Sequence, residues 1–371
     1  MAKRVLLLSE FYPPVPGGAE LAAQRLARCL LQLGLQPHVL TTDTSAGPPG
    51  WATVTEPDGL TVTRVRPDVP RPSPELMAKA LASCGPADLV MAFYLRSYAA
   101  VAVRQAARWG VPSLICARGR DALFDLNDWE TMPPIASAVR AATCVTAVTQ
   151  EIRQLLQPYR DEPDVLYWPN TVDLDRFRPM PQDAASRVRQ GLPAIGLLIG
   201  FFGNLRPSKG LEQLLGAFVR VQQQRPDAHL VIIGGLGPDE QRTLDDWLAA
   251  QPDVRTAVHV LPFVPQTALP PLLGCLDQAW YPALFDGFSN SLLQGIACEV
   301  PAIVTPVGGN ADVISDGRNG LVIPAGDVTA LTEAALRLAA DPTWARQLAG
   351  RGGGGLPAGH HPEGTERRAR R

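Results

Sequence analysis

The stretch YPALFDGFSNSLLQGIACEVPAIVTPVGGNADVISDGRNGLVIPAGD, residues 281–327, carries the most informative pattern in the chain. Its polar segment DGFSN leads into apolar residues at helical spacing, which predicts a helix with Ser289 or Asn290 as its N-cap. A helix that starts after glycine presents unpaired backbone N–H groups and the positive end of its dipole, an arrangement that suits a diphosphate. Residues 301–305 then predict a short buried strand, and Gly308-Gly309 a tight turn where backbone can approach a ligand closely.

A second loop with candidate phosphate-binding residues, GNLRPSKG at 203–210, follows an apolar run and precedes a helix with one apolar face. Lysine is rare in this chain, since it occurs only at Lys3, Lys79 and Lys209. Backbone amides and the cationic side chains of Arg206 and Lys209 can converge on a phosphate in such a loop. The alternative interpretation is that both residues are solvated surface charges.

Strand-like and helix-like segments alternate along the whole chain. Strands are expected at 5–8, 38–42, 60–65, 89–93, 113–117 and 144–148, and again at 195–202, 229–233, 258–261, 278–281 and 301–305. Helices are expected at 21–33, 97–109, 211–223 and 330–340, the first of them with Leu21, Leu26, Leu30 and Leu33 facing inward. This alternation predicts parallel sheets, and a length of 371 residues predicts two domains of roughly 150 to 180 residues each. We place the boundary in the turn-rich, proline-containing region that begins at Trp168, with domains at 1–175 and 176–345.

Residues 281–327 resemble the C-terminal signature of the retaining nucleotide-sugar glycosyltransferases of family 4, which have the two-domain GT-B fold. In that family two glutamates separated by seven residues hold the donor, the first facing the sugar ring and the second facing the ribose. Asp286 and Gln294 occupy those positions here, so the spacing is kept while the residue types differ. The surrounding text, with DGFSN, LLQGIACEVP and DGRNGLVIPAGD, matches the family in register. The segment PNTVDLDRFRP resembles the family's interdomain hinge, with Thr171 where glycine is usual.

The resemblance implies an α/β protein with two Rossmann-like domains facing across a cleft, the first binding the acceptor and the second the donor. It also implies a set of donor-binding positions, which are Gly17, Gly18, Gly203, Asn204, Val264, Phe288, Ser289, Asn290 and Gln294. The catalytic candidates are Lys209, Arg206, Asp286 and Arg118. Lys209 matches the family's lysine directly, whereas Asn204 stands where the family has arginine, so we infer that Arg206 replaces that charge.

The two altered donor positions have chemical consequences. Asp286 is one methylene shorter than glutamate and still accepts hydrogen bonds from sugar hydroxyls, which predicts a shifted donor. Gln294 offers the ribose one acceptor and one donor, so we expect weaker nucleotide binding than with a carboxylate. Alternatively, Gln294 is a solvent-facing or helix-packing amide.

Arg118 follows the predicted strand at 113–117 and falls at the carboxyl edge of the N-terminal sheet, where open α/β folds bind ligands. Many family members carry histidine at this position. Arginine stays protonated, which excludes general-base chemistry, but its guanidinium suits a phosphate or an acidic sugar. The alternative role for Arg118 is an ion pair with Asp121 or Asp125.

The activity implied by the resemblance is a retaining, metal-independent transfer of a sugar from a UDP- or GDP-linked donor to a hydroxyl. The acceptor would be a saccharide or a lipid-linked molecule in polysaccharide or glycolipid assembly. Two alternatives stay open: a degenerate sugar-nucleotide-binding protein without turnover, and a sugar-nucleotide epimerase. Asp173-Leu174-Asp175 matches a short metal-binding motif of another glycosyltransferase fold, but it lies in the predicted linker, so no metal site and no cofactor are expected.

Composition excludes several other classes of protein. The chain is 46% hydrophobic and 19% charged, with a net charge of −2 and a pI near 6.2, which predicts a globular protein without affinity for nucleic acid. The six cysteines are scattered without a paired motif, which is typical of a cytoplasmic protein. Because no window of about 18 apolar residues occurs, no membrane span is predicted. Peripheral contact with the inner face of the membrane stays open.

The final segment, residues 346–371, differs from the rest. From Gly350 onward it contains four consecutive glycines, lacks apolar periodicity and ends in arginines, so we expect disorder. Family members normally finish with a helix that braces the N-terminal domain. We therefore expect a truncated or frameshifted end, with a natural flexible tail as the alternative.

Overall fold

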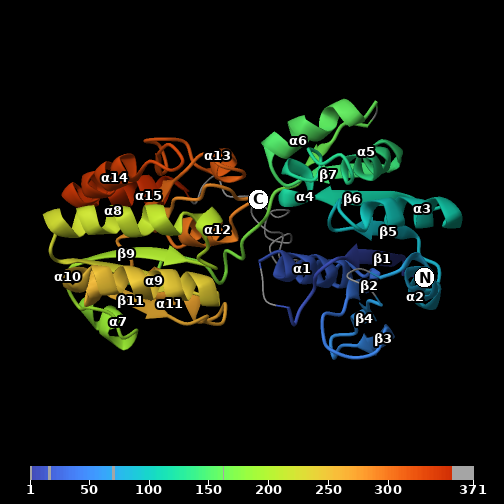
Figure 1. Cartoon of the computed structure of the whole chain (residues 1–371), viewed down its shortest axis with the longest axis horizontal. Helices are drawn as coiled ribbons and strands as arrows, with labels where there is room; N and C mark the ends of the chain where they lie inside the picture. Colours follow the sequence, from blue (N-terminus) through green and yellow to red (C-terminus); the bar gives the residue numbers. More distant parts are fainter. Residues whose placement is uncertain (1, 16–17, 69–71, 162, 353–371) are drawn as a thin grey trace, which may run out of the picture. The chain divides into compact units, whose positions relative to one another are not determined.

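The computed structural model describes residues 2–15, 18–68, 72–161 and 163–352. The chain divides into two compact units, the first ending at Asn170 and the second beginning at Thr171 (Figure 1). This division falls inside the turn-rich region that contains the predicted boundary. Each unit is an α/β structure built on its own sheet.

The first unit contains an eight-stranded sheet in the order β3-β4-β2-β1-β5-β6-β7-β8. Its strands are β1 (Arg4–Ser9), β2 (Gln36–Thr42), β3 (Gly50–Thr55), β4 (Thr61–Arg66), β5 (Leu89–Ala92), β6 (Ser113–Ala117), β7 (Cys144–Ala147) and β8 (Leu166–Tyr167). Its helices are α1 (Gly18–Gln32), α2 (Pro74–Cys84), α3 (Ala99–Trp109), α4 (Arg120–Leu123), α5 (Met132–Ala141) and α6 (Gln150–Leu156), with a short 3-10 turn, η1 (Gln157–Tyr159). Neighbouring strands are parallel, as predicted, except that the edge strand β3 pairs antiparallel with β4.

Helix α1 packs on this sheet through small residues. Ala22, Ala23 and Ala27 are buried beside Leu30, in one cluster with residues of β1 and β2. The predicted leucine face is therefore wrong in part, since Leu33 is 73% exposed. The small alanine side chains let the helix backbone lie close to the sheet. Leucine side chains on this face would be too large for such a close approach.

The second unit contains a six-stranded, wholly parallel sheet in the order β11-β10-β9-β12-β13-β14. Its strands are β9 (Leu197–Phe202), β10 (Ala228–Ile233), β11 (Val258–Leu261), β12 (Gln278–Tyr281), β13 (Ala302–Val304) and β14 (Leu321–Val322). Its helices are α7 (Ala184–Arg189), α8 (Leu211–Gln224), α9 (Pro238–Ala250), α10 (Pro252–Arg255), α11 (Leu269–Leu273), α12 (Asn290–Ala297), α13 (Asn310–Val313), α14 (Val328–Ala340) and α15 (Pro342–Gly352), with a 3-10 turn, η2 (Pro207–Lys209). The Rossmann-like pattern predicted for both halves of the chain is confirmed.

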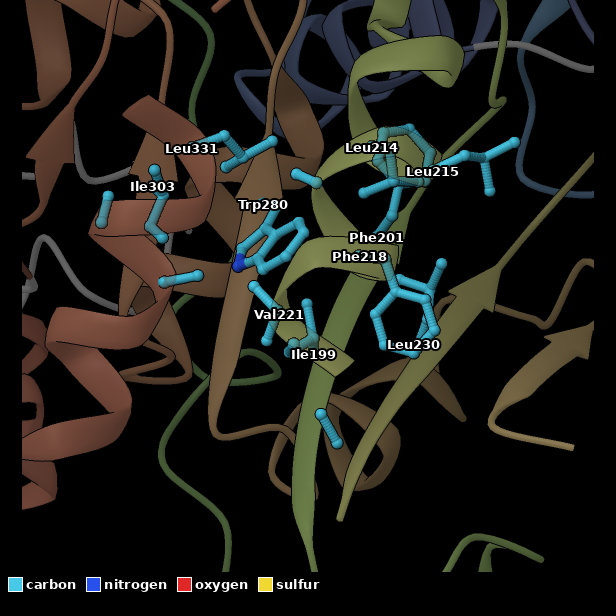
Figure 2. Packing of buried hydrophobic residues seen from close by; sticks show 14 of the residues in the cluster. Ile199, Phe201, Leu214, Leu215, Phe218, Val221, Leu230, Trp280, Ile303 and Leu331 are labelled. Carbon is cyan, nitrogen blue, oxygen red and sulfur yellow. The ribbon is translucent and has the colours of Figure 1, made fainter. Parts of the chain in front are cut away.

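The core of the second unit centres on Trp280, a fully buried residue of β12 (Figure 2). It belongs to a cluster that includes Phe201 of β9, Phe218 of α8 and Leu331 of α14. The indole Nε1 donates to Oε1 of Gln278 at 3.0 Å, so its polar atom is satisfied inside the core. This packing fixes the ends of β9 and β12, from which the candidate site begins.

The end of the described chain corrects one prediction. Residues 346–352 were assigned to the disordered tail, but they belong to helix α15. Leu348 and Ala349 are buried there, and α15 packs against α14 and α12. The burial of these two apolar side chains favours the helix despite the neighbouring glycines. Residues 353–371, the remainder of the predicted tail, lie outside the described residues.

Within the described ranges, no helix is both long enough and apolar enough to cross a membrane.

Candidate functional site

The loops of the second unit that follow its parallel strands leave the sheet at one edge. β9 lies between β10 and β12, so the chain moves to one side after β9 and reaches the other side at β12. Open α/β sheets bind ligands at the point where the strand order reverses in this way. The loops after β9 and β12, residues 203–210 and 282–289, flank that point. They contain the three charged residues of this unit that are predicted to act on the donor, Arg206, Lys209 and Asp286.

The side chains of Lys209 and Asp286 form an ion pair at this edge. Lys209 Nζ lies 2.6 Å from Asp286 Oδ2. The side chains are 30% and 13% exposed, respectively, so the pair is partly shielded from water. Partial burial strengthens the attraction between such charges relative to a fully exposed pair. The fold thus brings together two residues from loops that are distant in sequence.

Backbone contacts between the two loops hold Lys209 in place. The carbonyl oxygen of Ser208 accepts the N–H groups of Leu284 at 2.9 Å and Phe285 at 3.0 Å. Gly210 has φ +80°, and a Cβ on it would overlap the carbonyl oxygen of Pro282. Only glycine allows both this conformation and this approach. The position of Lys209 is therefore fixed by its neighbours on both sides.

The same loop reaches the start of helix α12. A Cβ on Gly203, which has φ +125°, would lie 3.8 Å from the hydroxyl of Ser291. Ser289 is the N-cap of α12, because its hydroxyl accepts the N–H of Leu292 at 3.2 Å. Of the two predicted caps, Ser289 is confirmed, and Asn290 is the first helical residue. The helix start, with its backbone N–H groups and dipole, thus lies beside the loop that carries Lys209.

The turn after β13 supports the segment before α12. Gly309 N–H donates to the carbonyl of Gly287 at 2.8 Å. Gly308 has φ +52°, and a Cβ there would overlap the carbonyl oxygens of Asp286 and Gly287. A Cβ on Gly309 would overlap the ring of Phe288, which is 7% exposed. Phe288 therefore packs its ring into the protein, and only its backbone is suited to meet a donor.

Gln294, on helix α12, is 7% exposed, so it is not a solvent-facing amide. Its Nε2 donates to Oε1 of Gln266 at 2.8 Å. Gln266 lies in the loop after β11, two residues beyond the half-buried Val264. The residues predicted to meet the ribose and the base, Gln294 and Val264, are thus linked through Gln266. Sequence reasoning missed Gln266. The only signal for it in the sequence was its position two residues after Val264.

Asn204 and Arg206 are exposed on the loop after β9. Asn204 lies beside the next loop, since a Cβ on Gly235 would come 2.9 Å from its Oδ1. The guanidinium of Arg206 takes part in no ion pair within the described residues. It is therefore not held against the Lys209–Asp286 pair.

Arg118 belongs to the first unit, where it follows β6. Its guanidinium lies 4.6 Å from the centre of the Phe93 ring and donates to the side-chain oxygen of Asn170. Burial lowers the pKa of the Arg118 guanidinium, although arginine remains charged in proteins. The side chain is thus oriented by an aromatic ring and an amide at the carboxyl edge of its sheet.

The two carboxylates considered as partners of Arg118 make other contacts. Asp121 accepts the backbone N–H groups of Leu95 at 2.8 Å and Gly119 at 2.8 Å, and also that of Arg118. Asp125 pairs with Arg96 at 3.4 Å. Asp121 therefore joins the loops after β5 and β6, which is a structural role.

The remaining predicted positions lie at the start of α1. Gly18 is the first residue of this helix, whereas Gly17 lies outside the described residues.

Two family models match the chain in succession. Residues 16–176 match Glycosyltransferase Family 4, and residues 196–341 match Glycosyl transferases group 1. A D-inositol 3-phosphate glycosyltransferase from Stackebrandtia nassauensis is 30% identical over 366 residues, covering 90% of this chain and 82% of the relative. This chain is a family-4 glycosyltransferase. A second relative, a GDP-mannose-dependent alpha-(1-6)-phosphatidylinositol monomannoside mannosyltransferase from Mycolicibacterium smegmatis, is 30% identical over 58% of each chain.

Solved structures agree with the fold of this glycosyltransferase. Sucrose-phosphate synthase from Thermosynechococcus elongatus has a TM-score of 0.78 at 19% identity, covering 95% of this chain and 93% of that one. HepE from Anabaena, solved in complex with UDP, has a TM-score of 0.77 at 18% identity, covering 95% and 94%. The predicted GT-B fold is confirmed. The relatives are transferases, which favours a transferase over the binding-only protein and the epimerase that the sequence left open.

Proposed function

We propose that this glycosyltransferase moves a sugar from a nucleoside-diphosphate donor to a hydroxyl with retention of anomeric configuration and without a metal ion. The observation that carries the proposal is the Lys209–Asp286 pair, with 2.6 Å between Nζ and Oδ2, at the strand-order reversal of the second unit. A cation and a carboxylate side by side suit the two ends of a sugar diphosphate. The cation meets the phosphate, and the carboxylate meets the sugar hydroxyls.

The leaving group explains why positive charge is needed here. As the glycosidic bond breaks, negative charge builds on the departing diphosphate and positive charge on the sugar ring. Lys209 neutralises the diphosphate, and the exposed Arg206 adds a second cationic group on the same loop. The N–H groups at the start of α12, beside Ser289 and Asn290, provide further donors. Since these groups supply the charge that a metal otherwise supplies, the proposed reaction is metal-independent.

The donor is a UDP- or GDP-linked sugar. HepE is described in complex with UDP and with UDP-glucose, and the mycobacterial relative is named as GDP-mannose-dependent, which supports both classes. In this chain, Gln294 bonds the ribose, and the backbone at Val264 reads the base. Gly203 and Asn204 border the phosphates.

The acceptor is a hydroxyl-bearing saccharide or lipid-linked molecule that carries an anionic group. Support comes from the names of relatives that act on D-inositol 3-phosphate. Arg118, oriented by Phe93 and Asn170, holds that anionic group. A lipid-linked acceptor would bring the enzyme to the inner face of the membrane.

The test begins with thermal melts of the full chain in the presence of UDP-, GDP- and ADP-linked sugars, because a ligand that binds the folded state raises the melting temperature. The selected donor is then incubated with inositol phosphates and with saccharide acceptors, and the product linkage is determined by NMR. The expected product has the donor's anomeric configuration and forms equally with and without EDTA. An inverted product contradicts the retaining mechanism, loss of activity in EDTA contradicts metal independence, and free sugar or epimerised donor without transfer contradicts the transferase.

A further inference from the structure

Gln266 has a side chain in contact with the proposed donor site but no role in the assignment above. Its Oε1 accepts a hydrogen bond from Nε2 of Gln294 at 2.8 Å. Gln294 is 7% exposed, so this bond is largely shielded from competing water. It joins the loop after β11 to the middle of helix α12.

The backbone around Gln266 is well anchored. Ala268 N–H donates to the carbonyl of Pro265 at 2.9 Å, which makes Gln266 the second residue of a turn. Leu269 follows directly as a buried residue at the start of α11. The loop is therefore held by β11 on one side and by α11 on the other, and Gln266 extends its side chain from an anchored backbone.

The Oε1 of Gln266, as the acceptor in this bond, determines which way the neighbouring amide of Gln294 faces. The side-chain amide of glutamine carries a donor nitrogen and an acceptor oxygen on separate branches of one plane. When Nε2 of Gln294 is held by Gln266, its Oε1 is turned to the opposite side. The glutamine then presents an acceptor, which is the function that a carboxylate has at this position.

We propose that Gln266 is a positioning residue that orients the Gln294 amide so that its carbonyl oxygen accepts a hydrogen bond from a ribose hydroxyl of the donor. This inference rests on the proposed ribose role of Gln294. It gives a physical reason why glutamine serves at a position that otherwise holds an acidic residue. Gln266 itself does not touch the ribose, and its effect is transmitted through Gln294.

The test measures binding of nucleotides with and without ribose hydroxyls. Calorimetry on the full chain gives the Kd of UDP and GDP and of their 2′-deoxy and 3′-deoxy forms, and the readout is the ratio of deoxy to ribo Kd for the tighter base. For the unaltered chain this ratio should be about tenfold for one neutral hydrogen bond. In Gln266→Leu it should fall to about one or two, since the Gln294 amide is no longer oriented.

Two further variants separate positioning from structure. Gln266→Glu keeps an acceptor for Nε2 of Gln294, so it should keep the ratio of the unaltered chain. Thr267→Ala changes the exposed neighbour in the same turn and should also leave the ratio unchanged. Melting temperatures of all variants report whether Gln266→Leu disturbs the fold instead.

The outcomes distinguish this inference from the function on which it rests. If Gln266→Leu keeps the discrimination while Gln294→Leu loses it, Gln266 does not orient the amide, and the donor site stands. If Gln294→Leu also keeps the discrimination, or if neither nucleotide binds, the ribose assignment is overturned together with this inference. A ratio that falls in Gln266→Leu and in Gln294→Leu but not in Gln266→Glu supports the inference.

Discussion

Lys209 Nζ lies 2.6 Å from Asp286 Oδ2, and this contact joins the loop after β9 to the loop after β12. These loops leave adjacent parallel strands, so their charged residues meet at one edge of the sheet. The pair gives the site a cation and an anion at a fixed separation. The first prediction concerns the anion.

Asp286→Asn should lower kcat and leave the binding of the nucleoside diphosphate unchanged or tighter. The substitution removes the charge that accepts hydrogen bonds from the sugar, while Lys209 becomes fully available to phosphate. We expect a fall in kcat of about 10- to 100-fold. Steady-state kinetics and calorimetry with UDP or GDP check both quantities. The matched control is Asp239→Asn, which changes a carboxylate on α9 that is 83% exposed. If Asp286→Asn loses nucleotide binding together with turnover, this role of Asp286 is contradicted.

The close contact at Gly210 predicts a difference between two glycines of the same region. Gly210→Ala should destabilise the protein by about 1–3 kcal/mol or more, because φ is +80° and the new Cβ overlaps the carbonyl of Pro282. Gly216→Ala, in the interior of α8, should stabilise it by about 0.5–1 kcal/mol, since the new Cβ lies an ordinary 3.5 Å from Val328. Urea unfolding compares the two variants. Equal effects would contradict the close approach of the two loops at Gly210.

The histidines of β10 and β11 predict acid sensitivity. His259 Nε2 lies 3.2 Å from His229 Nδ1, and burial lowers the pKa of both rings below the ordinary 6.5. For His229, the nearby Asp227 opposes this shift and Arg187 adds to it. Each of the two histidines therefore has a lower pKa in the folded state than in the unfolded state. The neutral rings contribute fully to the stability of the fold above about pH 6.5, and this contribution is lost as the pH falls through the folded-state pKa. The melting temperature should therefore decrease from pH 7 to pH 5.

His259→Gln removes one of the two titrating rings, so its melting temperature should fall less steeply over the same pH range. The comparison at pH 8, where both histidines are neutral, corrects for any change in packing. Identical slopes for the variant and the unaltered chain would exclude the pair as a source of acid sensitivity.

Arg118→Ala should raise the KM for an anionic acceptor by about tenfold or more and leave the KM for the donor unchanged, because a charge-assisted contact is lost. Arg120→Ala is the control, since this exposed neighbour stacks on Phe124 at 5.1 Å and has no proposed role in the site. Kinetics with a phosphorylated acceptor and with its uncharged analogue check the assignment. An equal effect on both acceptors would show that Arg118 does not bind the anionic group.

Buried elements were the most predictable part of the fold. The strand at 278–281 matches the buried strand β12 to the residue, and the strand at 258–261 matches the partly exposed β11, because a proline directly follows each segment and ends it. The apolar face of 211–223 was also correct, since Leu211, Leu214, Leu215 and Phe218 are all buried. Strand β3 was not predicted, because its residues are nearly all exposed and show no buried face. The end of the chain was wrong over 346–352, where burial by tertiary contacts outweighs a glycine-rich sequence.

The candidate site was predictable where sequence position determines location. Lys209 and Asp286 follow strands of one parallel sheet, so their loops must share an edge. Their direct ion pair, however, depends on side-chain geometry that spacing does not encode. Gln266 was missed for a similar reason, since its contact with Gln294 is set by how a loop and a helix pack together. Asn170 as the partner of Arg118 likewise follows from a non-local contact.

The central claim is that Lys209 holds the diphosphate of the donor, and calorimetry on Lys209→Ala tests it most directly. The unaltered chain should bind UDP or GDP more tightly than the corresponding monophosphate, and Lys209→Ala should lose most of that difference in affinity. The kcat/KM of Lys209→Ala should fall by an amount that corresponds to a loss of about 2–4 kcal/mol of transition-state stabilisation. Lys79→Ala, on the exposed surface of α2, is the matched lysine control and should behave as the unaltered chain. If Lys209→Ala keeps both the preference for the diphosphate and a near-normal kcat/KM, the account of this site is wrong.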